Sequence, residues 1–204
     1  DVTNRTIQKF TSAGTFITQW GSPGSADGAF GVVGVPQSGP FGMAFDPSGN
    51  LFVSDGSNTS LSNNRVQKFT SDGMFLLKWG RTGSGDGQLN GPTSPAVDAA
   101  GNIYVPECGN SRVQKFSGDG VFITKWGESG DSDGQFSCPV GMAVDQAGNV
   151  YVGDIQGNRI QKFTNTGTFI TTWGELGPDD GQFSNLLGVA VGRRGHVFAV
   201  DDQN

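Results

Sequence analysis

The sequence repeats itself with a period of about 47 residues. The string Gln-Lys-Phe occurs four times, and its phenylalanines are separated by 59, 47 and 47 residues. All four tryptophans stand in a Trp-Gly pair at the same three spacings, and an Asp-Gly pair begins seven residues after each of them. The recurring positions are Phe10, Phe69, Phe116 and Phe163; Trp20, Trp79, Trp126 and Trp173; and Asp27, Asp86, Asp133 and Asp180. A fixed period of this length indicates a fold in which identical small units pack against their neighbours.

Each unit contains four short strand patterns bounded by turn residues, which we call a, b, c and d. In the last complete unit they are Met142–Asp145, Val150–Val152, Arg159–Phe163 and Phe169–Trp173. β-Branched and aromatic residues fill these segments, and Gly-Asn pairs or single glycines separate them. Glycine makes up 34 of the 204 residues, and most of these glycines fall in the turns. No helical period extends over ten residues, so helix is predicted to be essentially absent.

Four antiparallel strands in each repeated unit predict an all-β fold, a β-propeller whose blades are four-stranded sheets. The units resemble NHL repeats, and the resemblance covers essentially the whole chain. It rests on Gly148–Phe163 and on the equivalent stretches Gly101–Phe116 and Gly49–Phe69. Two positions depart from the pattern, because Thr6 stands where strand c should have Arg and Gly192 stands where strand a should have Asp. The resemblance implies a propeller that usually has six blades.

We expect a single propeller domain over residues 1–204. Strands c and d of one blade lie within 1–20 (Ile7–Phe10 and Phe16–Trp20), three full units span about 41–173, and strands a and b lie at about 188–204. These sixteen strands amount to four blades' worth. The sequence leaves two arrangements open, a closed four-bladed ring or part of a six-bladed one. The chain starts at Asp1 rather than Met, which fits a mature form or a fragment.

Recurring acids are the first candidates for a binding site. In a four-stranded meander the d–a and b–c links share one face of the ring, here called the link face, and the a–b and c–d turns share the other, the turn face. The Asp-Gly acids of the d–a links should therefore lie beside the acids that end each strand b. These strand-b acids are the predicted binding residues: Asp55, Glu107, Asp154 and Asp201.

Two interpretations of this acidic link face remain open. It would suit a cationic partner or Ca²⁺ held by carboxylates and carbonyls, although Asp131–Gly134 and Asp179–Gly181 only approach a calcium-loop pattern. Alternatively, Asp-Gly is ordinary turn chemistry, and strand-b acids pair with strand-c arginines, as Glu107 with Arg112 and Asp154 with Arg159. The strand-c Lys and Arg residues are interpreted as scaffold because they recur at the same position in successive units.

Departures from the repeat are further candidates, because long loops on a rigid ring often determine binding specificity. They are the insertion Gly31–Pro40, the loop Gly56–Asn64, and two cysteines in neighbouring units. Cys108 and Cys138 are placed to form a disulfide, with two free thiols as the alternative. Glycosylation sequons begin at Asn4 and Asn58, a pattern that is common by chance.

Composition excludes several functions. The only histidine, His196, cannot form a three-His zinc site or an H-E-x-x-H motif, and it occupies a turn position. The net charge of −6 and the isoelectric point of about 4.6 disfavour nucleic acid, including the RNA bound by NHL propellers with basic faces. The apolar runs are too short to span a membrane, and no signal-peptide pattern is present.

The sequence therefore favours a non-catalytic binding or scaffold propeller whose loop-rich acidic face takes a protein, peptide or glycan. The alternative is a propeller hydrolase or lyase with a carboxylate or metal site at the channel mouth. No catalytic residue is predicted and no cofactor is expected, apart from Ca²⁺ as the candidate ion. A disulfide would indicate an oxidising compartment, hence an extracellular, periplasmic or cell-surface location.

Overall fold

The computed structural model describes residues 1, 3–35, 38–56 and 62–202, and its regular structure is almost entirely β-strand. The sixteen strands are β1 (Ile7–Phe10), β2 (Phe16–Trp20), β3 (Gly39–Phe45), β4 (Leu51–Gly56), β5 (Arg65–Phe69), β6 (Phe75–Trp79), β7 (Ala96–Val97), β8 (Ile103–Glu107), β9 (Arg112–Phe116), β10 (Phe122–Trp126), β11 (Pro139–Val144), β12 (Val150–Asp154), β13 (Arg159–Phe163), β14 (Phe169–Trp173), β15 (Leu186–Val191) and β16 (Val197–Asp201). A single 3₁₀ turn, η1 (Cys108–Asn110), interrupts them. No helix in the described part of the chain is long and apolar enough to cross a membrane.

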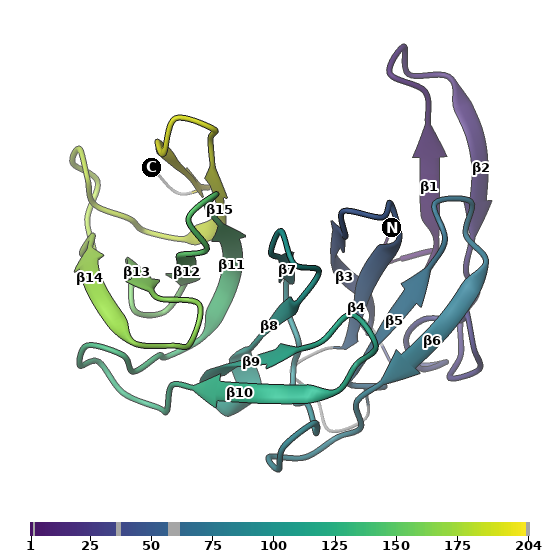
Figure 1. The fold of residues 1–204 in the computed structure, drawn as a ribbon, viewed down its shortest axis with the longest axis horizontal. Helices are drawn as coiled ribbons and strands as arrows, with labels where there is room; N and C mark the ends of the chain where they lie inside the picture. Colours follow the sequence, from purple (N-terminus) through teal and green to yellow (C-terminus); the bar gives the residue numbers. More distant parts are fainter. Residues whose placement is uncertain (2, 36–37, 57–61, 203–204) are drawn as a thin grey trace.

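The strands form five antiparallel sheets arranged as consecutive propeller blades. β3–β6, β7–β10 and β11–β14 are complete four-stranded blades in the order a-b-c-d, whereas β1–β2 and β15–β16 are separate two-stranded sheets. Figure 1 shows these sheets following one another around an open arc, with β1–β2 at one end and β15 at the other. The all-β propeller prediction is confirmed. The described strands form an open arc rather than a ring closed by a shared blade.

The hydrophobic core lies between the blades rather than inside any one of them. Four clusters of buried side chains each combine residues from two consecutive sheets. In one of them Tyr104 and Val113 from β8 and β9 pack against Phe136 and Phe163 of the next blade. A single blade has two apolar faces and no interior, so each sheet depends on its neighbours for burial.

The recurring tryptophan fixes how closely consecutive blades approach. Trp20, at the end of β2, lies over Gly73 in the c–d turn of the following blade, where a built Cβ would stand 2.6 Å from the indole. Gly73 also has a φ of +85°, which L side chains rarely adopt. Trp79 and Trp126 cover Gly120 and Gly167 in the same way. These three tryptophans therefore make inter-blade contacts with the c–d turn glycines of the following blades.

On the turn face, an Asp-Asn pair closes the a–b turn of each complete blade. Burial opposes the ionisation of Asp98. Hydrogen bonds from the Asn102 side chain and backbone and from the Tyr104 hydroxyl, together with the Lys115 ammonium, nevertheless hold the pKa of its carboxyl below the usual value. Burial and the neighbouring carboxylate raise the pKa of Tyr104. Asp46 and Asp145 have lowered pKa values for similar reasons. These acids hold the turns and are structural.

Candidate functional site

The strand-b acids lie inside the link face and are fully bonded to it. Glu107, at the end of β8, has no exposed surface. Its Oε1 accepts hydrogen bonds from Arg112 Nε at 2.7 Å and Gln114 Nε2 at 2.8 Å. Its Oε2 accepts from the Asn90 backbone N–H and from Asn110 Nδ2. The carboxylate therefore joins the b–c link of its own blade to the d–a link that precedes it.

The other strand-b acids occupy equivalent places. Asp55 and Asp154 are also completely buried. Asp55 accepts from Arg65 Nε at 3.0 Å, and Arg159 Nε lies 3.7 Å from Asp154. Asp201 accepts from the backbone N–H groups of the d–a link before it. The acid–Arg pairing is thus found in all three complete blades. A ligand-binding role for these acids stays a prediction, and a ligand would have to replace these internal bonds.

The strand-c arginine and glutamine extend this network into the preceding link. Arg112 donates to the carbonyls of Ser84, Gly85 and Gln88, while Gln114 accepts from the Gly87 N–H and donates to the Gln88 carbonyl. The same arrangement recurs around Arg65 and Arg159. A guanidinium is suited to this role because its donors form a rigid fork. Strand c of each complete blade therefore clamps the d–a link that precedes it, and the basic series is scaffold.

The exposed acids of the d–a links differ in whether a lysine neutralises them. Lys78 and Lys125, on the outer strands β6 and β10, form ion pairs with Asp27 and Asp86 of the preceding links. The equivalent residue on β14 is Thr172, so no such lysine faces Asp133. This pairing was missed from the sequence because the partners lie on different blades.

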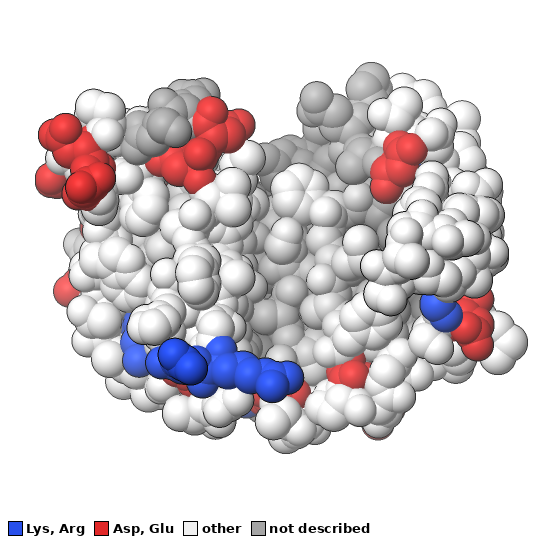
Figure 2. Space-filling model, turned by 90° about the horizontal axis from the view of Figure 1, so that it is seen from above, with Lys and Arg blue, Asp and Glu red and all other residues white. Residues whose placement is uncertain are grey.

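The unpaired acids gather towards the C-terminal end of the link face. We call them the acidic link surface, and all of them are exposed: Glu128, Asp131, Asp133, Glu175, Asp179 and Asp180. None of the ion pairs between described residues involves this surface. Figure 2 shows Asp and Glu along one rim of the arc, densest at its C-terminal end, with Lys and Arg gathered along the opposite rim.

A shallow hollow lies on this surface beside β10. It has a volume of about 350 Å³ and is lined by Gly127, Glu128 and residues 132–135. Within the described ranges, no group of three or more His, Cys, Asp or Glu side chains is arranged to hold a metal ion. His196 is exposed in the β15–β16 turn, away from these acids. The site as described is a negatively charged surface.

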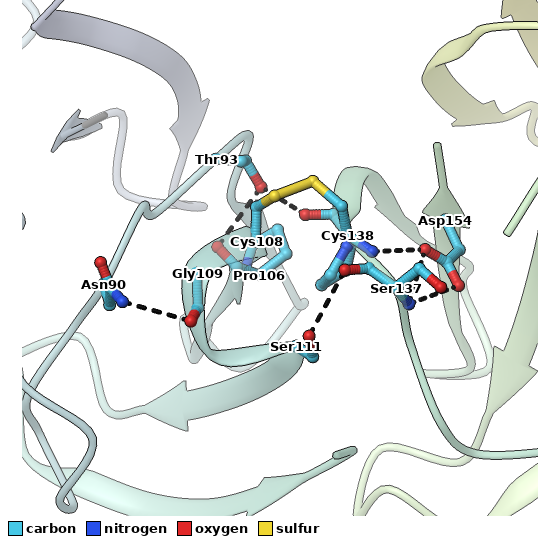
Figure 3. Close-up of a disulfide and its surroundings, with 10 residues drawn as sticks. Asn90, Thr93, Pro106, Cys108, Gly109, Ser111, Ser137, Cys138 and Asp154 are labelled. Atoms are coloured by element: carbon cyan, nitrogen blue, oxygen red, sulfur yellow. Dashed lines mark hydrogen bonds between the residues drawn. A yellow bond between two sulfur atoms is a disulfide. The ribbon is translucent and has the colours of Figure 1, made fainter. Parts of the chain in front are cut away.

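The predicted disulfide is present between Cys108 and Cys138. Cys108 begins η1 in a b–c link, and Cys138 precedes β11 in the next blade, where its N–H donates to Asp154 at 2.7 Å. Figure 3 shows the bridge crossing between the two blades, above the hydrogen bond that Ser111 donates to the Ser137 carbonyl. The cross-link therefore reinforces one blade junction on the link face.

Reduction of this disulfide should lower the free energy of unfolding by roughly 3–4 kcal/mol. The intact disulfide closes a loop of 30 residues and so restricts the unfolded chain, and reduction removes that restriction. Urea unfolding of the oxidised protein and of the Cys108→Ser/Cys138→Ser variant measures the difference. The double variant, which has no cysteine left, serves as the control, because its midpoint should be the same with and without reductant. Equal midpoints for the wild type with and without reductant would contradict this expectation.

The two loop departures are partly described. Arg5 donates to the carbonyls of Val35 and Ser38, which folds the insertion Gly31–Pro40 back onto the first half-blade. In the loop Gly56–Asn64, Asn63 donates to Asp55 and to two link carbonyls. Residues 36–37 and 57–61, including the sequon at Asn58, lie outside the described residues.

Comparisons with known proteins agree with this architecture. The streptogramin B lyase structure matches with a TM-score of 0.62 at 20% identity, over 84% of this chain and 51% of that one. A chain of the nidogen/laminin complex matches with a TM-score of 0.59 at 18% identity, over 82% and 58%. The chain is thus a protein of β-propeller architecture, and at these identities the likeness shows the fold alone.

The repeats themselves are similar to a known repeat family. The NHL repeat model matches residues 136–163, which run from the d–a link to the end of β13. The mouse NHL repeat-containing protein 3 is 30% identical over 104 residues, which is 51% of this chain and 29% of that protein. Residues 136–163 of this chain are thus an NHL repeat, and the chain is similar to NHL repeat-containing proteins. It matches less than a third of the mouse relative's length and spans about half of the two structures named above.

Proposed function

We propose that this chain is a binding propeller whose acidic link surface takes a cationic protein or peptide segment. The observation that carries the proposal is the contrast between two kinds of acid on the link face. The strand-b acids of the three complete blades (Asp55, Glu107 and Asp154) are buried and bonded within the scaffold, and Asp27 and Asp86 are neutralised by lysines. The acids of the last two links are exposed and have no basic partner among the described side chains.

Electrostatics favour a basic partner over a neutral one. Six carboxylates held on two adjacent rigid links create a local negative potential that attracts Lys- or Arg-rich segments and accelerates their association. The scaffold bonds to both links. Arg159 and Gln161 donate to carbonyls of the third link, and the backbone N–H groups of Ser184 and Asn185 in the fourth donate to Asp201. The disulfide lies at the same junction and fits an extracellular setting.

Neutralising part of this surface should weaken binding of a basic probe. The variant Asp131→Asn/Asp133→Asn removes two exposed charges while the backbone carbonyls that Arg159 uses remain. We expect roughly fivefold weaker binding of a fluorescein-labelled nona-arginine peptide at low salt, and a much smaller difference at high salt, where the charges are screened. Fluorescence anisotropy titrations at 50 and 500 mM NaCl measure both.

The matched control removes two exposed acids from the opposite face. Asp72 and Asp119 lie in c–d turns, so Asp72→Asn/Asp119→Asn changes the net charge equally. Equal losses of affinity in the two double variants would show that net charge alone attracts the peptide, and would contradict a localised site. A neutral peptide of the same length should not bind either protein.

A further inference from the structure

The b–c link of the third complete blade lacks a side chain that the first two complete blades have. Two residues before the strand-c arginine stand Asn63 in the first complete blade, Asn110 in the second and Gly157 in the third. Ser111 and Asn158, which follow the last two of these positions, both have a φ of +50°, as expected for links of equal length and equivalent backbone. The change from asparagine to glycine therefore removes an amide group from an otherwise equivalent place.

In the first two complete blades, oxygen atoms hold the nitrogen of this asparagine amide. Asn63 Nδ2 donates at 2.9–3.0 Å to three acceptors: the Gly24 carbonyl, the Gly31 carbonyl and Asp55 Oδ2. Asn110 Nδ2 likewise donates to the Gly83 carbonyl and to Glu107 Oε2. Each place thus binds a single nitrogen between the strand-b carboxylate and the d–a link that precedes the blade.

The third d–a link, between β10 and β11, has the same acceptors without that donor. By the repeat they are the Gly130 carbonyl, the Ser137 carbonyl and Asp154 Oδ2. Among the described residues, no donor bonds to the Gly130 carbonyl, and the Ser137 carbonyl accepts only from Ser111 Oγ, at 3.4 Å. Asp154 Oδ2 accepts from the Ser137 N–H, and the two residues lie together beside the disulfide (Figure 3). Asp154 differs from Glu107, whose two oxygens accept four hydrogen bonds, because one lone pair of its Oδ2 remains for a further donor.

Asp154 and Arg159 are further apart than the equivalent pairs. Arg159 Nε lies 3.7 Å from Asp154 Oδ2, whereas Arg65 and Arg112 bond to their acids at 3.0 and 2.7 Å. Arg159 Nε is buried and has no hydrogen-bond partner among the described atoms. A Cβ built on Gly157 would stand 2.4 Å from Asp154 Oδ2. The carboxylate is therefore directed towards the place that an asparagine side chain occupies in the other two blades.

Two further departures from the repeat make the same link more negative. Asp131 stands where the preceding link has Ser84, and Thr172 stands where β10 has Lys125. Asp131 lies close to the acceptors, because Ser137 Oγ donates to its Oδ1 at 3.3 Å. One change thus removes a hydrogen-bond donor, one adds a carboxylate and one removes a cation. All three favour a ligand group that is both a donor and a cation.

We infer that this place binds a lysine side chain of the cationic partner, whose ammonium donates to the Gly130 and Ser137 carbonyls and to Asp154 Oδ2. An ammonium has three N–H donors on one compact nitrogen, which matches three acceptors around one point, whereas the donors of an arginine are spread over a planar fork. Gly157 presents no side chain to the unbranched lysine stem, and Gly130, Ser137 and Gly157 are all partly exposed. The inference rests on the proposed function and names the side chain that anchors the partner.

Peptides that differ only in their N–H donors test this site. We expect the wild-type chain to bind fluorescein-labelled nona-lysine about fivefold more tightly than the same peptide with every lysine trimethylated at Nζ. Trimethylation keeps the positive charge and removes the hydrogen-bond donors. Fluorescence anisotropy titrations measure both affinities. Equal affinities of the wild-type chain for the two peptides would overturn the inference.

Gly157→Asn restores the side chain of the other two complete blades and leaves the net charge unchanged. Its amide should occupy the place of the ammonium, so the preference for nona-lysine over its trimethylated form should disappear. The φ of Gly157 lies outside the range that favours glycine, and Asp154 has only to turn back towards Arg159. Gln156→Asn, which places the same amide at the exposed neighbouring position, should keep the wild-type preference. A Gly157→Asn variant that also keeps the full preference would contradict the lysine site.

Nona-arginine separates this inference from the proposed function. Its binding depends on the acidic link surface as a whole, so Gly157→Asn, which keeps every acid, should bind it as the wild type does. If nona-arginine binds with the expected salt dependence but trimethylation of nona-lysine has no effect, the lysine site is wrong and the binding surface is retained. If no basic peptide binds, both are wrong. The comparison of the two lysine peptides uses the wild-type chain, so it decides the question even if Gly157→Asn does not fold.

Discussion

Replacing Glu107 by Ala should lower the free energy of unfolding by about 3–5 kcal/mol, because it leaves the charge of a buried arginine uncompensated. Glu107 is fully buried, and its two carboxylate oxygens accept four hydrogen bonds from Asn90, Asn110, Arg112 and Gln114. The alanine variant also leaves the Asn90 N–H without its acceptor. Urea-induced unfolding followed by circular dichroism measures the change.

An exposed ion pair gives the control for this prediction. Lys125 and Asp86 also join consecutive blades, but both side chains are about half exposed. Lys125→Ala should therefore cost less than about 1 kcal/mol. Glu107→Gln, which keeps the shape and one acceptor oxygen, should fall between the two. If Glu107→Ala and Lys125→Ala have the same midpoint, burial is not what gives this carboxylate its importance.

Replacing Phe163 by Ala should have an effect of similar size through a different mechanism. The Phe163 ring is fully buried on β13, and its centroid lies 5.6 Å from that of Phe136 and 5.9 Å from those of Trp126 and Phe169. Removing it opens a cavity between two blades, at an expected cost of about 3–5 kcal/mol in the free energy of unfolding. The same urea experiment measures it.

Met74→Ala is the matched truncation for Phe163→Ala, because Met74 is 66% exposed in a c–d turn. Its cost should stay within about 0.5 kcal/mol. Phe163→Leu should recover most of the lost stability, since it refills much of the cavity. Should Phe163→Ala unfold at the same urea concentration as Met74→Ala, the inter-blade cluster cannot be the main source of stability at this junction.

Much of the fold could be predicted from local sequence. The strands expected at Ile7–Phe10 and Phe16–Trp20 coincide with β1 and β2, because alternating β-branched and aromatic residues bounded by turn glycines specify a strand locally. The pairing of Glu107 with Arg112 was one of the two interpretations that the sequence offered, because the two residues face each other across adjacent strands. η1 was not expected, since a three-residue turn leaves no periodic signal.

It was harder to predict which acids are bonded within the scaffold and which are exposed without an ion-pair partner. Asp27, Asp86 and Asp133 look alike in the sequence. Among the described residues, only the first two have a lysine partner, on a strand about 40 to 50 residues away. The strand-b acids were predicted to bind a ligand because they recur on one face of the propeller. In the complete blades they recur because each one bonds to the strand-c arginine and is buried with it. Neither the lysine pairing nor the burial of these acids can be predicted from the sequence without knowing which blades are neighbours.

The sequence alone determined the repeat and the four-stranded unit, because strand period and turn glycines act over a few residues. Tertiary structure alone decided which of these equivalent side chains are covered. Met43 and Met142 occupy the same position in nearly identical strands, and one is exposed while the other is buried. The physical reason is that a blade buries its faces against its neighbours, so burial at each position is set by the adjoining sheet.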